Sequence, residues 1–171
     1  MRIRRAADSD RPGIARLHTA SWQDSYRAIL PDRLLDDELP AIMAARWAGQ
    51  EIGPRDAVLV AEDERGELLG FAASWDREPV YVDNLHVAAA ARSGGIGRKL
   101  LGETARHFLE IGREGALLHV IAANHRARAF YLALGGQPDG IEEKNLYGVP
   151  VPNERIVWPD LRVLRDRASE R

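Results

Sequence analysis

Residues 87–101 read V-A-A-A-A-R-S-G-G-I-G-R-K-L-L and form the most distinctive motif of the sequence. It joins an extended apolar segment to a helix, and three glycines, Gly94, Gly95 and Gly97, mark the turn between them. A glycine-rich turn at a helix N-terminus exposes backbone N–H groups beside the positive end of the helix dipole. The stretch therefore predicts a loop that binds a phosphate or pyrophosphate group.

Three sequence patterns compete to explain this loop. A Walker A loop needs serine or threonine after its lysine, but Lys99 is followed by Leu100. A dinucleotide-binding G-x-G-x-x-G pattern fails because Leu100 stands where the third glycine is needed. The pattern R-x-x-G-x-G is met by Arg92, Gly95 and Gly97. A purely structural turn explains the same glycines, so both interpretations stay open on this motif alone.

The segments expected on either side of the loop alternate between helices and strands. They are an edge strand over 1–5, helices over 9–26, around 34–35 and over 40–48, strands over 57–61, 67–75 and 79–87, a helix over 96–111, a strand over 116–122, a helix over 124–134, and late strands over 141–147 and 155–158. This order predicts a mixed α/β (α+β) fold with one parallel strand–helix–strand crossover at its centre. The charged tail, 162–171, is expected to fray or to form a surface helix.

Length and composition narrow the function classes. A chain of 171 residues predicts a single domain over residues 1–171. The net charge is −2, which gives no bulk electrostatic reason to expect a nucleic acid or an acidic membrane as partner. The chain has no cysteine, which excludes disulfides, thiolate metal sites and a cysteine acyl-enzyme.

Metal binding and export are also not expected. The histidines do not group with carboxylates at spacings typical of a metal site, so no metal is predicted. No apolar run approaches the ~20 residues of a membrane span. The N-terminus, M-R-I-R-R-A-A-D, lacks the apolar core of a signal peptide, so a cytoplasmic protein is expected.

Three motifs in sequence order resemble the GNAT superfamily of acyl-CoA-dependent N-acetyltransferases. The first is the strand L-H-V running into R-S-G-G-I-G; the second is the helix and apolar strand up to Ala122. The third is N-x-x-x-x-x-F-Y-x-x-x-G, met by Asn124, Phe130, Tyr131 and Gly135. The resemblance covers nearly the whole chain. It implies a mixed, mostly antiparallel central sheet with flanking helices and the single parallel crossover.

The resemblance also implies the residues that bind coenzyme A. The family holds the pyrophosphate on the backbone of the glycine loop and pairs the pantetheine arm with the strand before it. Carried onto this chain, the cofactor-binding residues are Leu85, His86, Val87, Arg92, Ser93, Gly94, Gly95, Ile96, Gly97, Arg98, Asn124 and Tyr131. Asn124 has an equally good role as a helix N-cap, and Arg98 as a solvated helix residue.

Tyr131 matches the family's general acid, which protonates the departing thiolate. The general base is open among Glu78, Tyr81, Asp83 and His86, on or near the strand before the loop, with His86 or Asp83 as the first candidates. Strand alternation places these two side chains on opposite faces, unless a bulge intervenes. His86 has a suitable reference pKa but also fits a hydrogen-bonded strand histidine. His119, on an apolar strand, is interpreted as structural.

The predicted function is transfer of an acetyl group from acetyl-CoA to a primary amine by direct attack in a ternary complex. Trp22 and Tyr26, one helical turn apart, are candidates for the acceptor pocket, although both also suit a core. A catalytically silent acyl-CoA-binding or sensor module is the alternative, and a nucleotide-binding protein with a coincidental glycine turn is a third hypothesis. The acceptor, a small molecule or a peptide, stays open, and so does a homodimer.

Overall fold

The apolar runs of the sequence form one seven-stranded sheet in the computed structural model, which describes residues 1–170. The strands lie in the order β1-β2-β3-β4-β5-β7-β6. Their bounds are β1 Arg2–Arg5, β2 Ala57–Glu62, β3 Leu68–Trp75, β4 Val80–Val87, β5 Ala116–Ile121, β6 Gln137–Leu146 and β7 Val149–Trp158. Within residues 1–170 only β4 and β5 pair in parallel, which confirms the predicted central crossover and the mostly antiparallel sheet.

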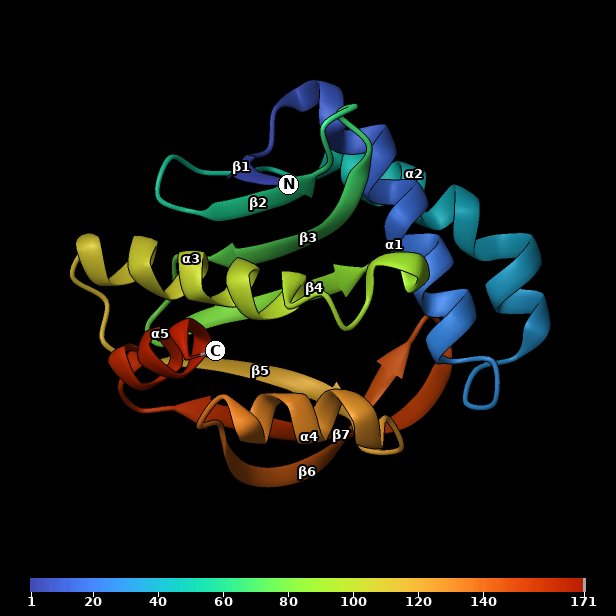
Figure 1. Ribbon diagram of the computed structural model, residues 1–171. Coiled ribbons are helices and arrows are strands. Elements are labelled where there is room, and N and C mark those ends of the chain that lie inside the picture. Colours follow the sequence, from blue (N-terminus) through green and yellow to red (C-terminus); the bar gives the residue numbers. More distant parts are fainter. Residues whose placement is uncertain (171) are drawn as a thin grey trace.

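Five α-helices cover the two faces of the sheet. Their bounds are α1 Arg11–Ser25, α2 Leu39–Gly49, α3 Ile96–Glu110, α4 His125–Ala133 and α5 Leu161–Ser169. In Figure 1, α3, α4 and α5 lie in front of the sheet, and α1 and α2 lie at its right and behind. No helix within residues 1–170 is long and apolar enough to cross a membrane.

Each face of the sheet buries its own apolar cluster. On one face, Trp47 of α2 and residues of α1 pack on Phe71 of β3. On the other face, Phe108 of α3 and Trp158 of β7 pack with residues of α4 and α5. Burial of apolar area on both faces is the main source of stability in such a layered fold. The two clusters hold the strands β4 and β5 between helices that approach from opposite sides.

The C-terminal part differs from the sequence-based expectation in two ways. The late strands are longer than predicted and form one hairpin, β6–β7, closed by Tyr147 and Gly148 with φ of 50° and 89°. Positive φ at both central residues is what a tight type I′ hairpin turn requires. The tail also does not fray. It forms α5, which packs Leu161, Leu164 and other apolar residues against α3. Arg171, the last residue of the predicted tail, lies outside the described residues.

Gly136→Ala is expected to destabilise the protein by about 1–3 kcal/mol because it overpacks the core between α4 and β6. A Cβ at this position would lie 2.6 Å from Ile156 Cγ2, 2.8 Å from Trp158 Cζ2 and 2.9 Å from the Tyr131 carbonyl oxygen. Urea unfolding measures the free energy of unfolding.

Gly49→Ala is the matched control for this substitution. Gly49 ends α2, and a Cβ there would meet no atom within 4 Å, so alanine should leave the stability unchanged or raise it slightly. An equal stability of the Gly136→Ala variant and the unmodified protein would contradict the packing argument.

Candidate active site

A cleft opens where β4 and β5 part. The two strands pair only at Val80–Ala116 and Tyr81–Leu117. Beyond that point β4 continues against β3 to Val87, and β5 continues against β7. The β4 backbone after Tyr81 therefore has no strand partner on its β5 side. A cleft of about 470 Å³ lies there and reaches the N-terminal ends of α3 and α4.

The cleft brings together nearly all the predicted site residues. It is lined by Asp83, Leu85, His86, Val87, Arg92, Ser93, Gly95, Ile96, Gly97, Arg98, Asn124, Tyr131 and Tyr26. Gly94 and Trp22 are the predicted residues that do not line it. Trp22 is 8% exposed and packs edge-on to Tyr26 within the α1–α2 cluster. Segments far apart in the sequence thus meet at one opening in the sheet.

The glycine loop leaves the first turn of α3 open to an anion. Ser93 and Gly95 both have left-handed backbones, with φ of 68° and 74°. Gly95 is the N-cap of α3, and within residues 1–170 no side chain caps this helix end. The first intrahelical bond runs from the Lys99 N–H to the Gly95 carbonyl, so the N–H groups before it lack helical partners. These donors and the helix dipole favour a phosphate group at the loop.

Gly97 allows three elements to approach closely behind the loop. A Cβ there would lie 3.4 Å from Phe130 Cζ of α4 and 3.7 Å from side-chain atoms of Leu85 and Val87 of β4. These are ordinary van der Waals distances, so an alanine would fit at this position, and only a longer side chain would require α4 or β4 to move.

Two arginines near the loop make contacts within the protein. Arg92 donates to the Val87 carbonyl at 3.2 Å and pairs with Asp24 of α1. Arg98 donates to the carbonyls of Arg167 and Glu170 at the end of α5, at 2.7 and 3.2 Å. The Arg92 guanidinium therefore connects the glycine loop to α1. The Arg98 guanidinium connects α3 to the end of α5.

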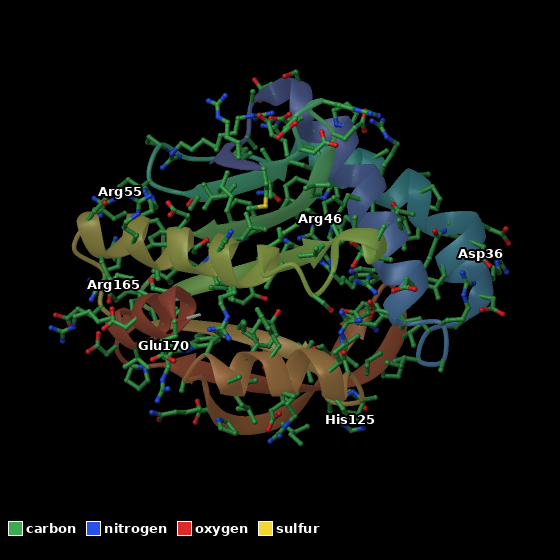
Figure 2. The ribbon with its side chains drawn as sticks, viewed as in Figure 1. Asp36, Arg46, Arg55, His125, Arg165 and Glu170 are labelled. Carbon is green, nitrogen blue, oxygen red and sulfur yellow. The ribbon has the colours of Figure 1, made fainter. Side chains whose placement is uncertain are left out.

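Arg126 is a cleft residue that the sequence analysis missed. It lies in the first turn of α4, whose start is marked by the labelled His125 in Figure 2. Its side chain is exposed and has no ion-pair partner among the described residues. Its position two residues after Asn124 was the available signal, since an arginine close to a bound phosphate forms strong charge-assisted hydrogen bonds with it.

Asn124 and two tyrosines form the wall opposite the loop. Asn124 caps α4, because its Oδ1 accepts from the Ala127 N–H at 3.2 Å. Burial raises the pKa of Tyr26, and Asn124 opposes this shift. Tyr131 is 9% exposed, and burial together with the nearby Tyr26 raises the pKa of its phenol. Tyr131 therefore stays protonated in the neutral range.

A β-bulge places Asp83 and His86 on the same face, which corrects the expectation from strict alternation. The pairing of β3 with β4 shifts between Ala73–Asn84 and Ser74–Val82, so Asp83 is the extra residue. Asp83 and His86 consequently both point toward α1 and α2, and both line the cleft.

A family model confirms what this geometry indicates. The acetyltransferase (GNAT) family model matches residues 14–135. The chain belongs to the GNAT acetyltransferase family. It is 28% identical over 174 residues to the uncharacterized N-acetyltransferase YuaI of Bacillus subtilis, covering 95% of each chain. It is also 31% identical over 90 residues to a D-amino-acid N-acetyltransferase of Saccharomyces cerevisiae, covering 48% of this chain and 56% of that protein.

A solved structure has the same fold as this GNAT protein. The protein yncA of Salmonella typhimurium, determined with its cofactor acetyl-CoA, aligns with a TM-score of 0.67. The alignment covers 94% of each chain at 23% sequence identity. The similarity supports the conclusion that this sheet, which opens between β4 and β5 and is covered by helices, has the GNAT fold.

In this GNAT protein, Asp83 is held by two donors. Arg46 of α2, labelled in Figure 2, pairs with its Oδ2 at 2.8 Å. The Trp75 indole N–H donates to the same oxygen at 2.9 Å. The contacts fix the carboxylate on the α1–α2 side of the cleft and occupy one of its two oxygens.

His86 is held neutral in a buried polar stack. Its Nδ1 lies 2.8 Å from Ser21 Oγ, and its ring lies 4.4 Å from the ring of His18. Burial, with Arg46 and Arg92 nearby, lowers the pKa of His86 to about 3. Burial likewise lowers the pKa of His18, whose Nδ1 accepts from the Trp47 indole at 3.0 Å. An imidazole with so low a pKa is a weak proton acceptor at neutral pH.

The low pKa of His86 predicts a loss of stability in acid. The folded pKa lies below the unfolded value of ~6.5, so the unfolded state binds the proton more tightly and stability falls as pH drops from 6.5 toward 3. Between pH 7 and pH 5 this histidine alone should cost about 2 kcal/mol. Urea unfolding at the two pH values measures the difference.

His86→Gln removes one of the two buried histidines with a lowered pKa and should make this pH dependence shallower. His107→Gln, at a histidine of α3 that does not line the cleft, is the matched control for replacing a histidine by glutamine. An unchanged slope in His86→Gln would show that other groups cause the acid sensitivity.

Proposed function

We propose that this chain transfers an acetyl group from acetyl-CoA to a primary amine by direct attack in a ternary complex. The observation that carries the proposal is the uncapped N-terminus of α3 beside the unpaired edge of β4. The first feature suits a pyrophosphate, and the second suits an extended amide-containing arm that adds as a strand. Acetyl-CoA carries both groups. The D-amino-acid acetyltransferase among the relatives supports an amine acceptor.

Each part of the cleft has a proposed role. Backbone N–H groups from Arg92 to Gly97 hold the pyrophosphate, and Arg126 adds positive charge beside it. Leu85, His86 and Val87 supply backbone groups to the pantetheine arm, and a β4 N–H polarises the thioester carbonyl. Asn124 contacts the arm from the opposite wall.

Tyr131 is proposed as the general acid. Its phenol is protonated in the neutral range and lines the cleft, so it can give its proton to the departing thiolate. The acceptor approaches from the α1–α2 side, where Tyr26, Asp83 and His86 line the cleft. The reaction relies on proximity, carbonyl polarisation and proton transfer.

Acetyl-CoA consumption by the purified protein tests the proposal. The assay follows thiol release with a panel of spermidine, D-phenylalanine, a short peptide and kanamycin, and calorimetry measures acetyl-CoA binding in parallel. We expect binding together with acetylation of at least one amine. Binding without turnover would instead support a silent acyl-CoA-binding or sensor module. Binding of ATP or NAD with none of acetyl-CoA would contradict the proposal.

A further inference from the structure

Beside the cleft, the face of the sheet that carries α1 stays partly open. Tyr81 of β4 and Leu117 and His119 of β5 are only half-buried on this face, although both strands are central in the sheet. Helix α1 packs on β3 and β4, and α4 lies on the other face, in front of β5 and β7 in Figure 1. His119 lines the cleft, and its ring lies 5.9 Å from the Tyr81 ring. The open face therefore continues the α1–α2 side of the cleft.

The charged side chains around this open face form ion pairs, with one exception. The pairs are Arg46–Asp83, Lys144–Glu142 and Arg155–Asp139, with N–O distances of 2.8, 2.8 and 2.9 Å. Arg77, between β3 and β4, is exposed and has no carboxylate partner within residues 1–170. The acidic residues on either side of it in the sequence, Asp76 and Glu78, pair with Arg113. The open face thus carries one positive charge that these acidic side chains do not neutralise.

Tyr81 holds the side chain of Arg77 beside this face. The guanidinium carbon of Arg77 lies 5.2 Å from the centroid of the Tyr81 ring, which is a cation–π distance. Burial and Asp83 raise the pKa of Tyr81, whereas Arg77 and Arg46 lower it, so both cations act on this part of the face. The ring restricts the arginine but leaves its N–H donors available.

The chemistry of Arg77 suits a carboxylate. A guanidinium presents its donors in a planar fork that matches the two oxygens of a carboxylate. One guanidinium also balances the single charge of a carboxylate, whereas a phosphate monoester carries about −1.5 to −2 at pH 7. Because Tyr81 already restricts the side chain, binding an anion there costs less conformational entropy than at a freely moving arginine.

We propose that the acceptor is an amine that also carries a carboxylate, and that Arg77 binds this carboxylate beside the open face. The proposal rests on the acetyl transfer proposed above and names the class of its acceptor. It assigns Arg77 as a specificity-determining residue, with Tyr81 as the residue that positions it.

The place of Arg77 in the fold sets the distance between the amine and the carboxylate. The thioester is proposed to lie at the part of β4 that begins with Leu85, beyond the bulge at Asp83. Leu85 follows Tyr81 by four residues, which is roughly 10–13 Å along an extended strand with a bulge. A single amino acid spans only about 3.5 Å, whereas an extended tripeptide spans about 10 Å. The geometry therefore favours an acceptor about as long as a tripeptide over a single amino acid.

The test compares triglycine with triglycinamide as acceptors. The two peptides have the same amine and nearly the same length, and they differ in the charge at the far end. We expect kcat/KM to be about 10-fold higher for triglycine, mainly through a lower KM, because a hydrogen-bonded charge pair at an exposed arginine adds about this much. Glycine, which is too short to reach Arg77 from the thioester, should be a poorer acceptor than triglycine.

Substitutions of Arg77 test the residue itself. Arg77→Gln should raise the KM of triglycine about 10-fold and leave the KM of triglycinamide unchanged, so that the preference disappears. Arg77→Lys keeps the charge without the planar fork and should retain part of the preference. Arg65→Gln is the matched control, because Arg65 is an exposed arginine in the turn between β2 and β3 that does not line the cleft. It should leave both acceptors unchanged.

Binding and turnover together separate this proposal from the proposed function. Calorimetry of triglycine with the protein saturated with coenzyme A measures acceptor binding without chemistry. Binding that depends on Arg77, without turnover of acetyl-CoA with any amine, would reject acetyl transfer and keep the carboxylate site. Equal kcat/KM for triglycine and triglycinamide, or an unchanged preference in Arg77→Gln, would reject the carboxylate site and leave acetyl transfer intact. Acetylation of other amines without any of triglycine would reject the carboxylate site as well.

Discussion

Tyr131→Phe is expected to lower kcat by about 1000-fold while changing the dissociation constant of acetyl-CoA by less than about twofold. Without the phenol, the thiolate must depart unprotonated or take its proton from water. Phenylalanine keeps the edge-on ring contacts with Phe130 and Trp158, at 5.4 and 6.3 Å, so the fold should be preserved. Steady-state thiol release gives kcat, and calorimetry gives the dissociation constant.

Phenylalanine substitutions at two further tyrosines provide a control and a comparison for this experiment. Tyr147→Phe is the control, because Tyr147 lies at the β6–β7 turn, does not line the cleft and should leave kcat unchanged. Tyr26→Phe distinguishes the two buried phenols of the cleft wall. If Tyr26→Phe abolished turnover and Tyr131→Phe did not, the acid would be Tyr26 and the assignment from the F-Y motif would be wrong.

The glycine-loop side of the cleft was predictable from the sequence because its determinants are local. A turn such as S-G-G-I-G needs residues that adopt positive φ, and Ser93 and Gly95 do so. The strand before it and the helix after it are set by hydrophobic periodicity. Asn124 and Tyr131 follow at fixed spacing on the next helix, so their place in the cleft follows from the single crossover.

The α1–α2 side of the cleft could not be predicted because it depends on contacts between distant segments. The bulge at Asp83 appears only in the pairing of β4 with β3. Alternation along β4 alone therefore predicted that Asp83 and His86 lie on opposite faces, which is wrong. The contact between His119 of β5 and Glu142 of β6 also joins two different strands. The hydrogen bond from Arg98 to α5 was also not predictable, because the charged tail was expected to fray or to form a surface helix.

Ser93→Asp is expected to weaken acetyl-CoA binding by about 100-fold. Ser93 is exposed, lines the cleft and precedes the open N-terminus of α3, where the pyrophosphate is proposed to bind. A carboxylate about 5 Å from a phosphate charge costs about 3 kcal/mol at an effective dielectric constant of about 20. Titration calorimetry at low ionic strength measures the dissociation constant. Added salt should reduce the penalty, since it screens exposed charges.

Ser93→Asn separates charge from shape in this experiment. Asparagine and aspartate have nearly the same size, and both tolerate the left-handed backbone that Ser93 adopts at φ 68°. The asparagine variant should therefore bind acetyl-CoA within about fivefold of the unmodified protein, a loss no larger than one hydrogen bond. Equal weakening by both substitutions would mean that the serine hydroxyl or the loop shape matters. If both variants bound acetyl-CoA as tightly as the unmodified protein, the pyrophosphate would lie away from this loop. The proposed pyrophosphate site would then be wrong.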